Sequence, residues 1–498
     1  MYNLRILFNY NNGDFMFKSL KENINYLQDI TSSSADFTVR KMKLNDGTFV
    51  AIFTIEGMVN KDGLTLAVSD PLLSATIPTG VNKYEFIRDR VLSTPEIIEI
   101  NTFDELLDFS MSGFAVLGIE GYEKMLVIGL QGFSFRSVSE PSSEMVFRGS
   151  REGFTEPLRI NMSLIRRRMK NPDLVFQTMT IGNLSKTQIC LCYLKSAVSK
   201  SILKELKRRL NNLNLDTVLA SGYLVSYLGD EDKNTLLSTV GVTERPDTLC
   251  GKITEGRIGI LVDGTPSAIL VPHLFIENFQ SFDDYSNRPY FASFIRILKY
   301  LSFLFAIYLP SLFIAITDFH PEYIPVGLLT HISNSLETTP FPLMLEVMFV
   351  AFMYEVMREA GLRLPKPLGH AVGIVGALVI GETGVSAGLI CPTTLIIVAF
   401  SAICSYVIPE LYGTITVVKF IYIIISGIFG VIGIILASLI AIISVCSLKS
   451  FGVPYLAPIV PISKGIISDN FIRSDWHRLI KHKVKLQNMV GVDDKFEK

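Results

Sequence analysis

Residues 364–448 form a stretch of 85 residues with only four Asp, Glu, Lys or Arg side chains, in a chain whose charged fraction is 19%. About sixteen charges would be expected at that average. So large a deficit indicates that this part of the chain lies in a membrane, where charged groups are disfavoured. We expect Lys366, Glu410 and Lys419 to mark the ends of apolar segments, whereas Glu382 lies inside one.

The overall composition excludes several classes of protein. Of the 498 residues 49% are hydrophobic, and 46 basic residues balance 47 acidic ones. This argues against a disordered chain and against a nucleic-acid-binding protein. The six cysteines show no CxxC or Cys/His spacing, so we expect reduced thiols and neither a metal nor another cofactor. Because nucleophile, phosphate-loop and zinc-protease motifs are missing from the sequence as well, we expect no enzymatic activity.

The order of short strands and helices before residue 277 predicts an α/β region of two subdomains, followed by an α-helical integral membrane domain. Residues 1–15 are either an upstream extension before Met16 or part of the first subdomain. The expected boundaries are 1–140 for the first α/β subdomain, 141–276 for the second, 277–296 for an aromatic-rich interfacial linker, 297–448 for a membrane domain with four to five apolar segments, and 449–498 for an interfacial segment and a basic cytoplasmic tail.

Local signals place several elements of the α/β region. Asn45-Asp46-Gly47 predicts a hairpin between two strands, and Thr102 followed by Glu105 predicts a capping box at the start of a helix. Further strand pairs are expected between 125–129 and 133–138, and between 258–262 and 267–271.

Five apolar segments follow the linker, and basic residues predict their orientation. Positive charges after the second segment and in the tail indicate that both lie in the cytoplasm, together with the α/β region. Five full crossings would put the tail on the opposite side, so one segment must be re-entrant or lie flat. The segments are 297–317, 343–362, 371–390, 393–408 and 418–447.

Small residues recur at four-residue spacing in the third apolar segment. Such a face lets helices approach closely in lipid, and we interpret it as the packing face of a tight, oligomeric helix bundle. Mere tolerance of glycine in membrane helices is the alternative. The set consists of Gly373, Ala377, Gly381, Gly384 and Gly388; both interpretations stay open for a second set, Gly427, Gly430 and Gly433.

Acidic residues in the apolar segments are candidates for function. Glu382 either lines a cation pathway or sits at a water-exposed re-entrant tip. Glu346 and Glu355 are nine residues apart on one helix, which places them on roughly opposite faces. They cannot both face one pore, and we expect Glu355 to form a surface pair with Arg358 or Glu359.

Several polar motifs resemble those of one protein family. The segment Arg148-Gly149-Ser150-Arg151-Glu152-Gly153-Phe154 is similar to the RGxREGF signature of the A subunits of GerA-type spore germinant receptors. The resemblance continues in order along most of the chain. The further motifs are TERPD at 243–247, EGR at 255–257, VDGTP at 262–266, REAGLRLPKP at 358–367, VIGE at 379–382 and SFGVPY at 450–455.

The resemblance implies a multi-pass protein of the inner membrane of a bacterial spore, with a two-part N-terminal region on the cytoplasmic, core side. It implies as partners a transporter-like B subunit, thought to bind the nutrient, and a lipoprotein C subunit. The A subunits are expected to form a homo-oligomer that acts as a ligand-gated ion channel. Relatives often carry Gln at the position of Glu382, so a charge there is not expected to be universal.

The resemblance leaves the roles of the matched charged positions open, and our interpretation is structural. The segment 243–247 is interpreted as a proline-set turn, and Glu255 with Arg257 as a surface pair beside a hairpin. The charged motif positions are Arg148, Arg151, Glu152, Glu244, Arg245, Asp247, Glu255, Arg257, Asp263, Arg358, Glu359 and Arg363.

Three hypotheses of function remain. The first is a channel-type receptor subunit that takes part in nutrient-triggered germination. The second is a non-conducting membrane scaffold that assembles the B and C subunits. The third is a secondary transporter, which is disfavoured because no inverted repeat is visible in the sequence. Within the family, an accessory protein that amplifies germination is the alternative to a nutrient-receptor subunit.

Overall fold

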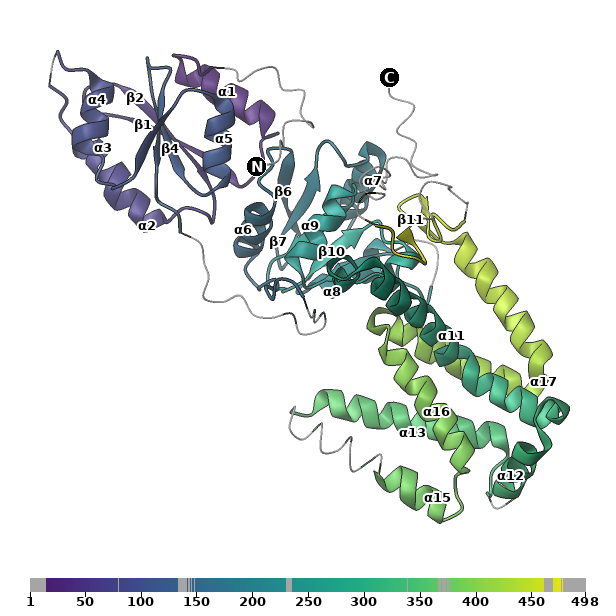
Figure 1. Ribbon diagram of the computed structural model, residues 1–498. Coiled ribbons are helices and arrows are strands. Elements are labelled where there is room, and N and C mark those ends of the chain that lie inside the picture. Colours follow the sequence, from purple (N-terminus) through teal and green to yellow (C-terminus); the bar gives the residue numbers. More distant parts are fainter. Residues whose placement is uncertain are drawn as a thin grey trace.

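The computed structural model consists of two α/β units followed by a bundle of long helices (Figure 1). It describes residues 15–475 and 477, apart from 79, 133–140, 142–143, 145, 147, 230–234, 338, 366–368, 370–372, 374–375, 377 and 461–468.

The first α/β unit is an antiparallel five-stranded sheet in the order β1-β2-β4-β5-β3, with helices on both faces (Figure 1). Helices α1 and α5 cover one face, and the helices between β2 and β3 cover the other. The elements are α1 (Leu20–Ile30), β1 (Phe37–Lys43), β2 (Phe49–Ile55), α2 (Lys61–Leu64), α3 (Asp70–Ser74), α4 (Lys83–Phe86), β3 (Ile97–Ile100), α5 (Phe103–Met111), β4 (Ala115–Ile119) and β5 (Met125–Ile128).

Two sequence signals explain the local structure of this unit. The expected hairpin joins β1 to β2 across Gly47, whose φ of 86° suits a glycine. The expected capping box is present at α5, where Thr102 accepts from the backbone N–H of Glu105 and the Glu105 carboxylate accepts from that of Thr102. The expected pairing of 125–129 with 133–138 is wrong: β5 already has β4 and β3 as its two neighbours, and 133–138 lie outside the described residues.

The second α/β unit repeats the arrangement of the first. Its antiparallel sheet has the order β6-β7-β9-β10-β8, which is the first unit's strand order, and its helices fall at the corresponding places in the chain. The elements are α6 (Leu158–Arg168), β6 (Leu174–Ile181), β7 (Thr187–Leu194), α7 (Lys200–Asn211), α8 (Ser221–Leu228), β8 (Gly241–Thr243), α9 (Pro246–Thr254), β9 (Ile258–Val262) and β10 (Ala268–Val271).

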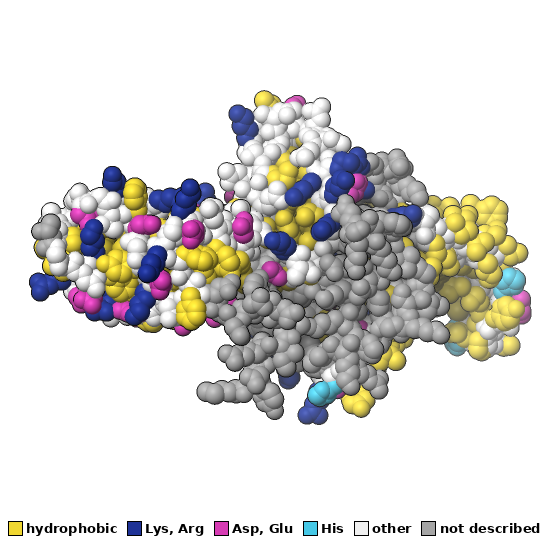
Figure 2. All heavy atoms as spheres, turned by 90° about the horizontal axis from the view of Figure 1, so that it is seen from above, with side chains coloured by type: hydrophobic (Ala, Val, Ile, Leu, Met, Phe, Trp, Pro, Cys, Tyr) yellow, Lys and Arg dark blue, Asp and Glu magenta, His cyan; other side chains and the backbone are white. Residues whose placement is uncertain are grey.

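The C-terminal third is helical and apolar. Two helical stretches, 289–319 and 409–447, are long and apolar enough to cross a membrane, and α16 is shorter. Hydrophobic side chains cover this end of the molecule, whereas charges are scattered over the first unit (Figure 2). The elements are α10 (Phe282–Ser286), α11 (Pro289–Phe319), α12 (Val326–Leu336), α13 (Leu343–Arg363), α15 (Gly384–Ser386), α16 (Pro392–Tyr406) and α17 (Tyr412–Ser447).

Helix α17 folds back on itself at Gly430 (Figure 1). The Tyr422 hydroxyl donates to Ser438 Oγ at 3.2 Å, although sixteen residues of straight helix would span about 24 Å. Gly430 has φ 60° and ψ −145°, a conformation that is open almost only to glycine. A Cβ there would also lie 2.8 Å from the Phe319 ring, at the end of α11.

The chain after α17 returns to the second α/β unit. The short hairpin β11 (Lys449–Ser450) and β12 (Val453–Pro454) leads to residues that pack into that unit's core: Phe451, Val453 and Ala457. The Ser450 hydroxyl donates to the Thr239 carbonyl at 2.6 Å and accepts from the His273 N–H. We expected an interfacial segment here, but these residues complete a soluble core instead.

The linker expected at 277–296 is mostly helical. Helix α11 begins at Pro289, eight residues before the expected start of the first span. Its aromatic residues divide into two groups. Phe279 and Tyr285 pack inward, whereas Tyr290 and Phe294 remain exposed on α11, the latter two as expected for an interfacial belt.

We predict that Gly430→Val opens the fold-back of α17, because valine is strained in this conformation by about 1–3 kcal/mol and would press on Phe319. Cysteines placed at 422 and 438, in a chain whose native cysteines are replaced by serine, should lose most of their cross-linking by a short bifunctional thiol reagent. Gly413→Val in the same helix is the control, because a Cβ at Gly413 meets no described atom within 4 Å. Equal cross-linking in both backgrounds would contradict the prediction.

Candidate functional site

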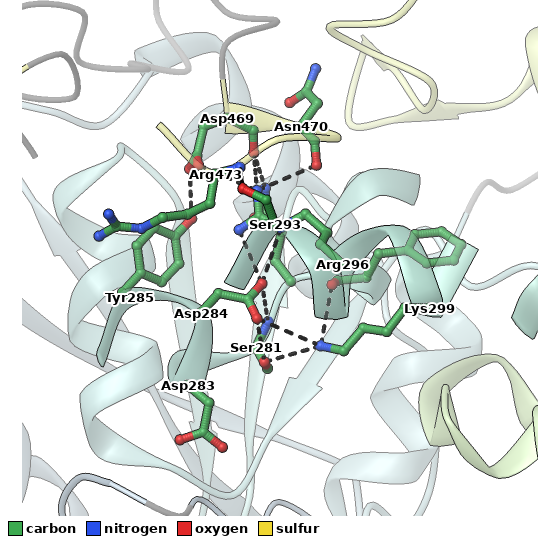
Figure 3. A network of polar contacts seen from close by, with 12 residues as sticks. Ser281, Asp283, Asp284, Tyr285, Ser293, Arg296, Lys299, Asp469, Asn470 and Arg473 are labelled. Atoms are coloured by element: carbon green, nitrogen blue, oxygen red, sulfur yellow. Dashed lines mark hydrogen bonds and ion pairs between the residues drawn. The ribbon is translucent and has the colours of Figure 1, made fainter. Parts of the chain in front are cut away.

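A buried guanidinium holds α10, α11 and the C-terminal segment together (Figure 3). Arg296 on α11 has no exposed surface. Its Nε donates to Asp284 of α10 at 3.1 Å, and its Nη1 lies 3.2 Å from Asp469 and donates to the Asn470 carbonyl. A buried charge requires such pairing, so the arginine fixes where α10, α11 and the distant residues 469–470 meet.

Neighbouring side chains extend this network (Figure 3). The Tyr285 hydroxyl donates to Asp469 at 2.8 Å, and burial followed by the Asp469 charge raises the pKa of Tyr285 well above its usual range. Lys299, one turn beyond Arg296, donates to Ser281 Oγ at 3.0 Å. The guanidinium of Arg473 lies over the Tyr285 ring. Arg473, which belongs to the segment expected to hold a basic cytoplasmic tail, is 2% exposed.

A second buried ion cluster lies between α9, β9 and the residues that follow β10. Arg257 Nη2 lies 2.5 Å from Glu277, Lys252 Nζ lies 2.6 Å from the same carboxylate, and His273 Nδ1 lies at 3.3 Å. Burial would raise the pKa of Glu277, but Arg257 and Lys252 outweigh it and hold that pKa well below its usual range. The expected surface pair of Glu255 and Arg257 exists at 2.6 Å, but Arg257 is buried and joined to Glu277 as well.

Arg245 connects the RGxREGF segment to α9. It is 2% exposed, and its guanidinium donates to both oxygens of Asp247 and to the Ser150 carbonyl. It also lies over the Phe282 ring of α10, 5.3 Å from the centroid. The segment 243–247, expected to be a turn, contains the start of helix α9. Pro246 is its first helical residue, and Asp247 lies in its first turn, where the negative charge interacts favourably with the helix dipole.

The other matched positions also hold elements of the second unit in place. Glu152 forms ion pairs with Arg167 and Arg168 at the end of α6, and Asp263 accepts from the Leu158 N–H at the start of that helix. The remaining positions lie nearby: the Arg148 N–H donates to Asp283, the Glu244 carbonyl accepts from the Phe154 N–H, and Arg151 is exposed.

A polar cluster lies among the apolar helices. Lys419 of α17 is 0% exposed, and its Nζ lies 3.3 Å from Glu355 of α13. The Tyr412 hydroxyl donates to the same carboxylate at 2.6 Å, and Arg358 pairs with it at 3.1 Å while lying over the Tyr412 ring. Lys419, expected at the end of an apolar segment, lies within α17, seven residues after its start at Tyr412, and is buried there. Glu355 is likewise an interhelical partner as well as the partner of Arg358.

Glu346, on the same helix, is fully buried. One carboxylate oxygen accepts from the Cys391 N–H at 2.7 Å, at the N-terminus of α16, where the helix dipole favours a negative charge. Farther along α13, Glu359 pairs with Arg363 at 2.7 Å on an exposed surface.

Glu382 is exposed in the π-helical turn 379–383 that precedes α15.

The glycines of the third apolar segment do not form one packed face within the described chain. A Cβ at Gly381 would touch Leu395 at 3.6 Å, one at Gly384 would touch Ile390 at 3.0 Å, and one at Gly373 would meet no described atom within 4 Å. Gly388 has a left-handed φ of 68° in the following turn, and Ala377 lies outside the described residues. In the second set, Gly427 packs closely on Met344.

The comparison with known families is decisive. The family model described as "Bacillus/Clostridium GerA spore germination protein" matches residues 25–484. The chain belongs to this family. The family is one of spore germination proteins and not a known family of enzymes, which agrees with the missing enzymatic motifs.

Individual relatives extend over nearly the whole chain. Spore germination protein KA of Bacillus subtilis is 38% identical over 92% of this chain and 85% of its own length. Spore germination protein GerLA of Bacillus cereus is 33% identical over 92% of this chain and 93% of its own. The crystal structure of the N-terminal domain of the A subunit of the Bacillus megaterium spore germinant receptor GerK3 is 29% identical, covers 53% of this chain and 99% of its own, and has a TM-score of 0.43.

Sequence reasoning about this GerA-family chain missed the residues that join its parts. Arg296, Asp284, Asp469 and Glu277 were not singled out. The sequence did contain a signal for Arg296 and Asp284. Both are charged residues of the aromatic-rich segment 277–296, and a charge buried in such a segment needs a partner of opposite charge. Asp469 lies 173 residues from Arg296, and no local pattern could link them.

We predict that Arg296→Gln destabilises the protein by about 3–5 kcal/mol, because it removes the cation nearest to the buried Asp284 and to Asp469 and leaves Asp284 with Lys299 alone, 3.9 Å away. Unfolding of the detergent-solubilised chain by denaturant measures the change. Arg288→Gln, which alters an exposed arginine at the N-cap of the same helix, should stay within about 0.5 kcal/mol of the parent. If both variants lose a similar amount of unfolding free energy, the buried ion pairs of Arg296 do not contribute the stability that we predict.

We predict that Lys419 and Glu355 are energetically coupled. Lys419→Met and Glu355→Gln should each destabilise the helical region, since each leaves a buried polar partner. The double variant should lose less than the sum of the two, by about 1–3 kcal/mol. Unfolding in mixed micelles, followed for all four chains of the cycle, gives this coupling energy; strictly additive losses would contradict it.

Proposed function

We propose that this protein is a membrane subunit of a spore germinant receptor and oligomerises into a ligand-gated cation channel in the spore inner membrane. Membership of the GerA family supports the role in germination. The apolar helices support the membrane location. The transporter-like B subunit and the lipoprotein C subunit are the partners that we propose for it.

The attachment of the helices to the second α/β unit is the observation that carries the proposal. Arg296 joins the start of the first long helix to α10, whose Phe282 packs on Arg245 of the unit, and residues 449–457 join the unit to the end of the last helix. The beginning of α17 lies there too, because Thr414 donates to the Leu236 carbonyl. A displacement of the unit would therefore move several helices together, which is how a soluble domain can control a pore.

The fold-back of α17 suits the orientation expected from the basic residues. Each half is about 26 Å long, close to the roughly 30 Å of a bilayer core. We propose that α17 crosses the membrane and returns, which leaves both its ends and the C-terminal segment on the cytoplasmic side with the α/β units. If α17 crosses twice, the five apolar segments make six crossings instead of five. An even number of crossings returns the tail to the side of the α/β units.

Glu382 remains our candidate for the pore, because its carboxylate is exposed within this chain and a ring of such groups in an oligomer would attract cations. We predict that Glu382→Gln lowers cation release from germinating spores by about tenfold, the low end of electrostatic rate effects. Glu337→Gln, at an exposed carboxylate after α12, should leave release unchanged. Normal release from the Glu382 variant would remove it from the pathway.

Conductance distinguishes the channel from the scaffold. The purified chain, alone and with its partner subunits, would be reconstituted in planar bilayers. A cation current that requires this chain, together with a symmetric ring in detergent, supports the channel. A chain that assembles with its partners yet never conducts supports the non-conducting scaffold.

A further inference from the structure

A cavity of about 620 Å³ lies where the second α/β unit meets the membrane helices. Its walls come from both sides: β8, α9 and α10 of the soluble region, and the turn between α16 and α17 with the first residues of α17. A cavity of this size holds a small organic molecule. Its position means that a ligand would touch both parts of the protein at once.

One part of the wall is apolar. Val225, Leu236, Val240, Leu270 and Val407 line it, and these side chains can bind only an uncharged body. Aromatic contact is available from Phe282, which lines the cavity together with the Arg245 guanidinium that lies over its ring.

The basic groups on the wall are already engaged. Lys252 lies 2.6 Å from Glu277, Lys299 donates to Ser281 Oγ at 3.0 Å, and Arg245 binds Asp247 through two nitrogens. His273 Nε2 lies 3.1 Å from the side-chain oxygen of Asn278. These groups therefore have little capacity left for an anionic ligand.

Two carboxylates on the wall have few protein partners. Among the described residues, Glu410, an exposed side chain, makes no hydrogen bond or ion pair, and the half-buried Glu144 accepts one hydrogen bond, at 2.7 Å from the Thr243 hydroxyl. A carboxylate can accept about four hydrogen bonds. The two groups come from opposite sides of the junction, Glu144 from the segment before α6 and Glu410 from the turn before α17.

We propose that this cavity binds a small organic cation, a primary ammonium on an apolar body, whose charge is held between Glu144 and Glu410 while its body lies on the valine and leucine wall. The ammonium supplies the three donors that the carboxylates lack, and it cancels their mutual repulsion. Binding would join the soluble unit to the start of α17. The site does not depend on whether the chain conducts, and thus goes beyond the proposed function.

The ionisation of Glu144 supports the same assignment. Burial, with the nearby Glu410 charge, raises the pKa of Glu144 to about 7, against the opposing effects of the Thr243 hydroxyl and Arg245. An ammonium ligand needs the ionised form. Its affinity should therefore rise as the pH increases from 6 to 8, over which range the amine stays protonated.

Three matched probes test the proposal on the full chain in detergent: phenethylamine, the uncharged 2-phenylethanol and the anionic 3-phenylpropionate. Titration calorimetry should show saturable binding of the amine, and at least about tenfold weaker binding of the other two, since a charge-assisted hydrogen bond is lost. Glu410→Gln and Glu144→Gln should each weaken amine binding by a similar factor. Gly413→Phe should abolish it by filling the cavity, because the space beside Gly413 is open within the described chain.

Controls separate binding from folding and from the micelle. Each variant is compared only where its melting temperature without ligand matches the parent, and Glu410→Asp should restore part of the affinity. Glu337→Gln should bind the amine normally. Equal binding of alcohol and amine, unchanged binding in the Glu410 and Glu144 variants, preference for the carboxylate probe or no saturable binding at all would each overturn the proposal. None of these results would bear on conductance.

Discussion

The buried guanidinium of Arg296 is the constraint on which the relation between the soluble and membrane parts depends. A charge with no exposed surface must keep all its partners, and those partners come from α10 and from residues 469–470. The position of α11 relative to α10, and that of residues 469–470 relative to both helices, are therefore set by the same side chain. Glu277, shared by Arg257 and Lys252, is a second buried charge that must keep its partners.

The two α/β units share one arrangement but differ in what they contact. A second buried arginine, Arg166 on α6, joins them: it pairs with Asp36 of the first unit at 2.7 Å and donates to two backbone carbonyls of its own unit. Within the described residues, the segment that follows the last long helix packs into the core of the second unit. The two units thus share one strand order, and the second one also contacts the long helices.

Local features of the fold could be predicted from the sequence, and long-range ones could not. The hairpin at Gly47 and the capping box at Thr102 depend on residues within a few positions of each other, so their patterns are sufficient. The charge deficit likewise predicted an apolar helical region, and two of its helical stretches are long and apolar enough to cross a membrane. Lys419 was misplaced because its partner lies 64 residues away on another helix, and hydropathy alone cannot show a fold-back in an unbroken apolar run. The matched motifs identified Arg245 and Arg257, but only the structure showed that both are buried.

The return of residues 449–457 to the second α/β unit has a consequence for how the protein is made. Strand β10 ends at Val271 and β11 begins at Lys449, so the ribosome must produce the entire membrane region before this core can close. At about 5–20 residues per second, the roughly 180 intervening residues take about 10–35 seconds. During that interval part of the unit's apolar core is uncovered. The synthesis of the helical region and the completion of this core are therefore steps of one ordered assembly.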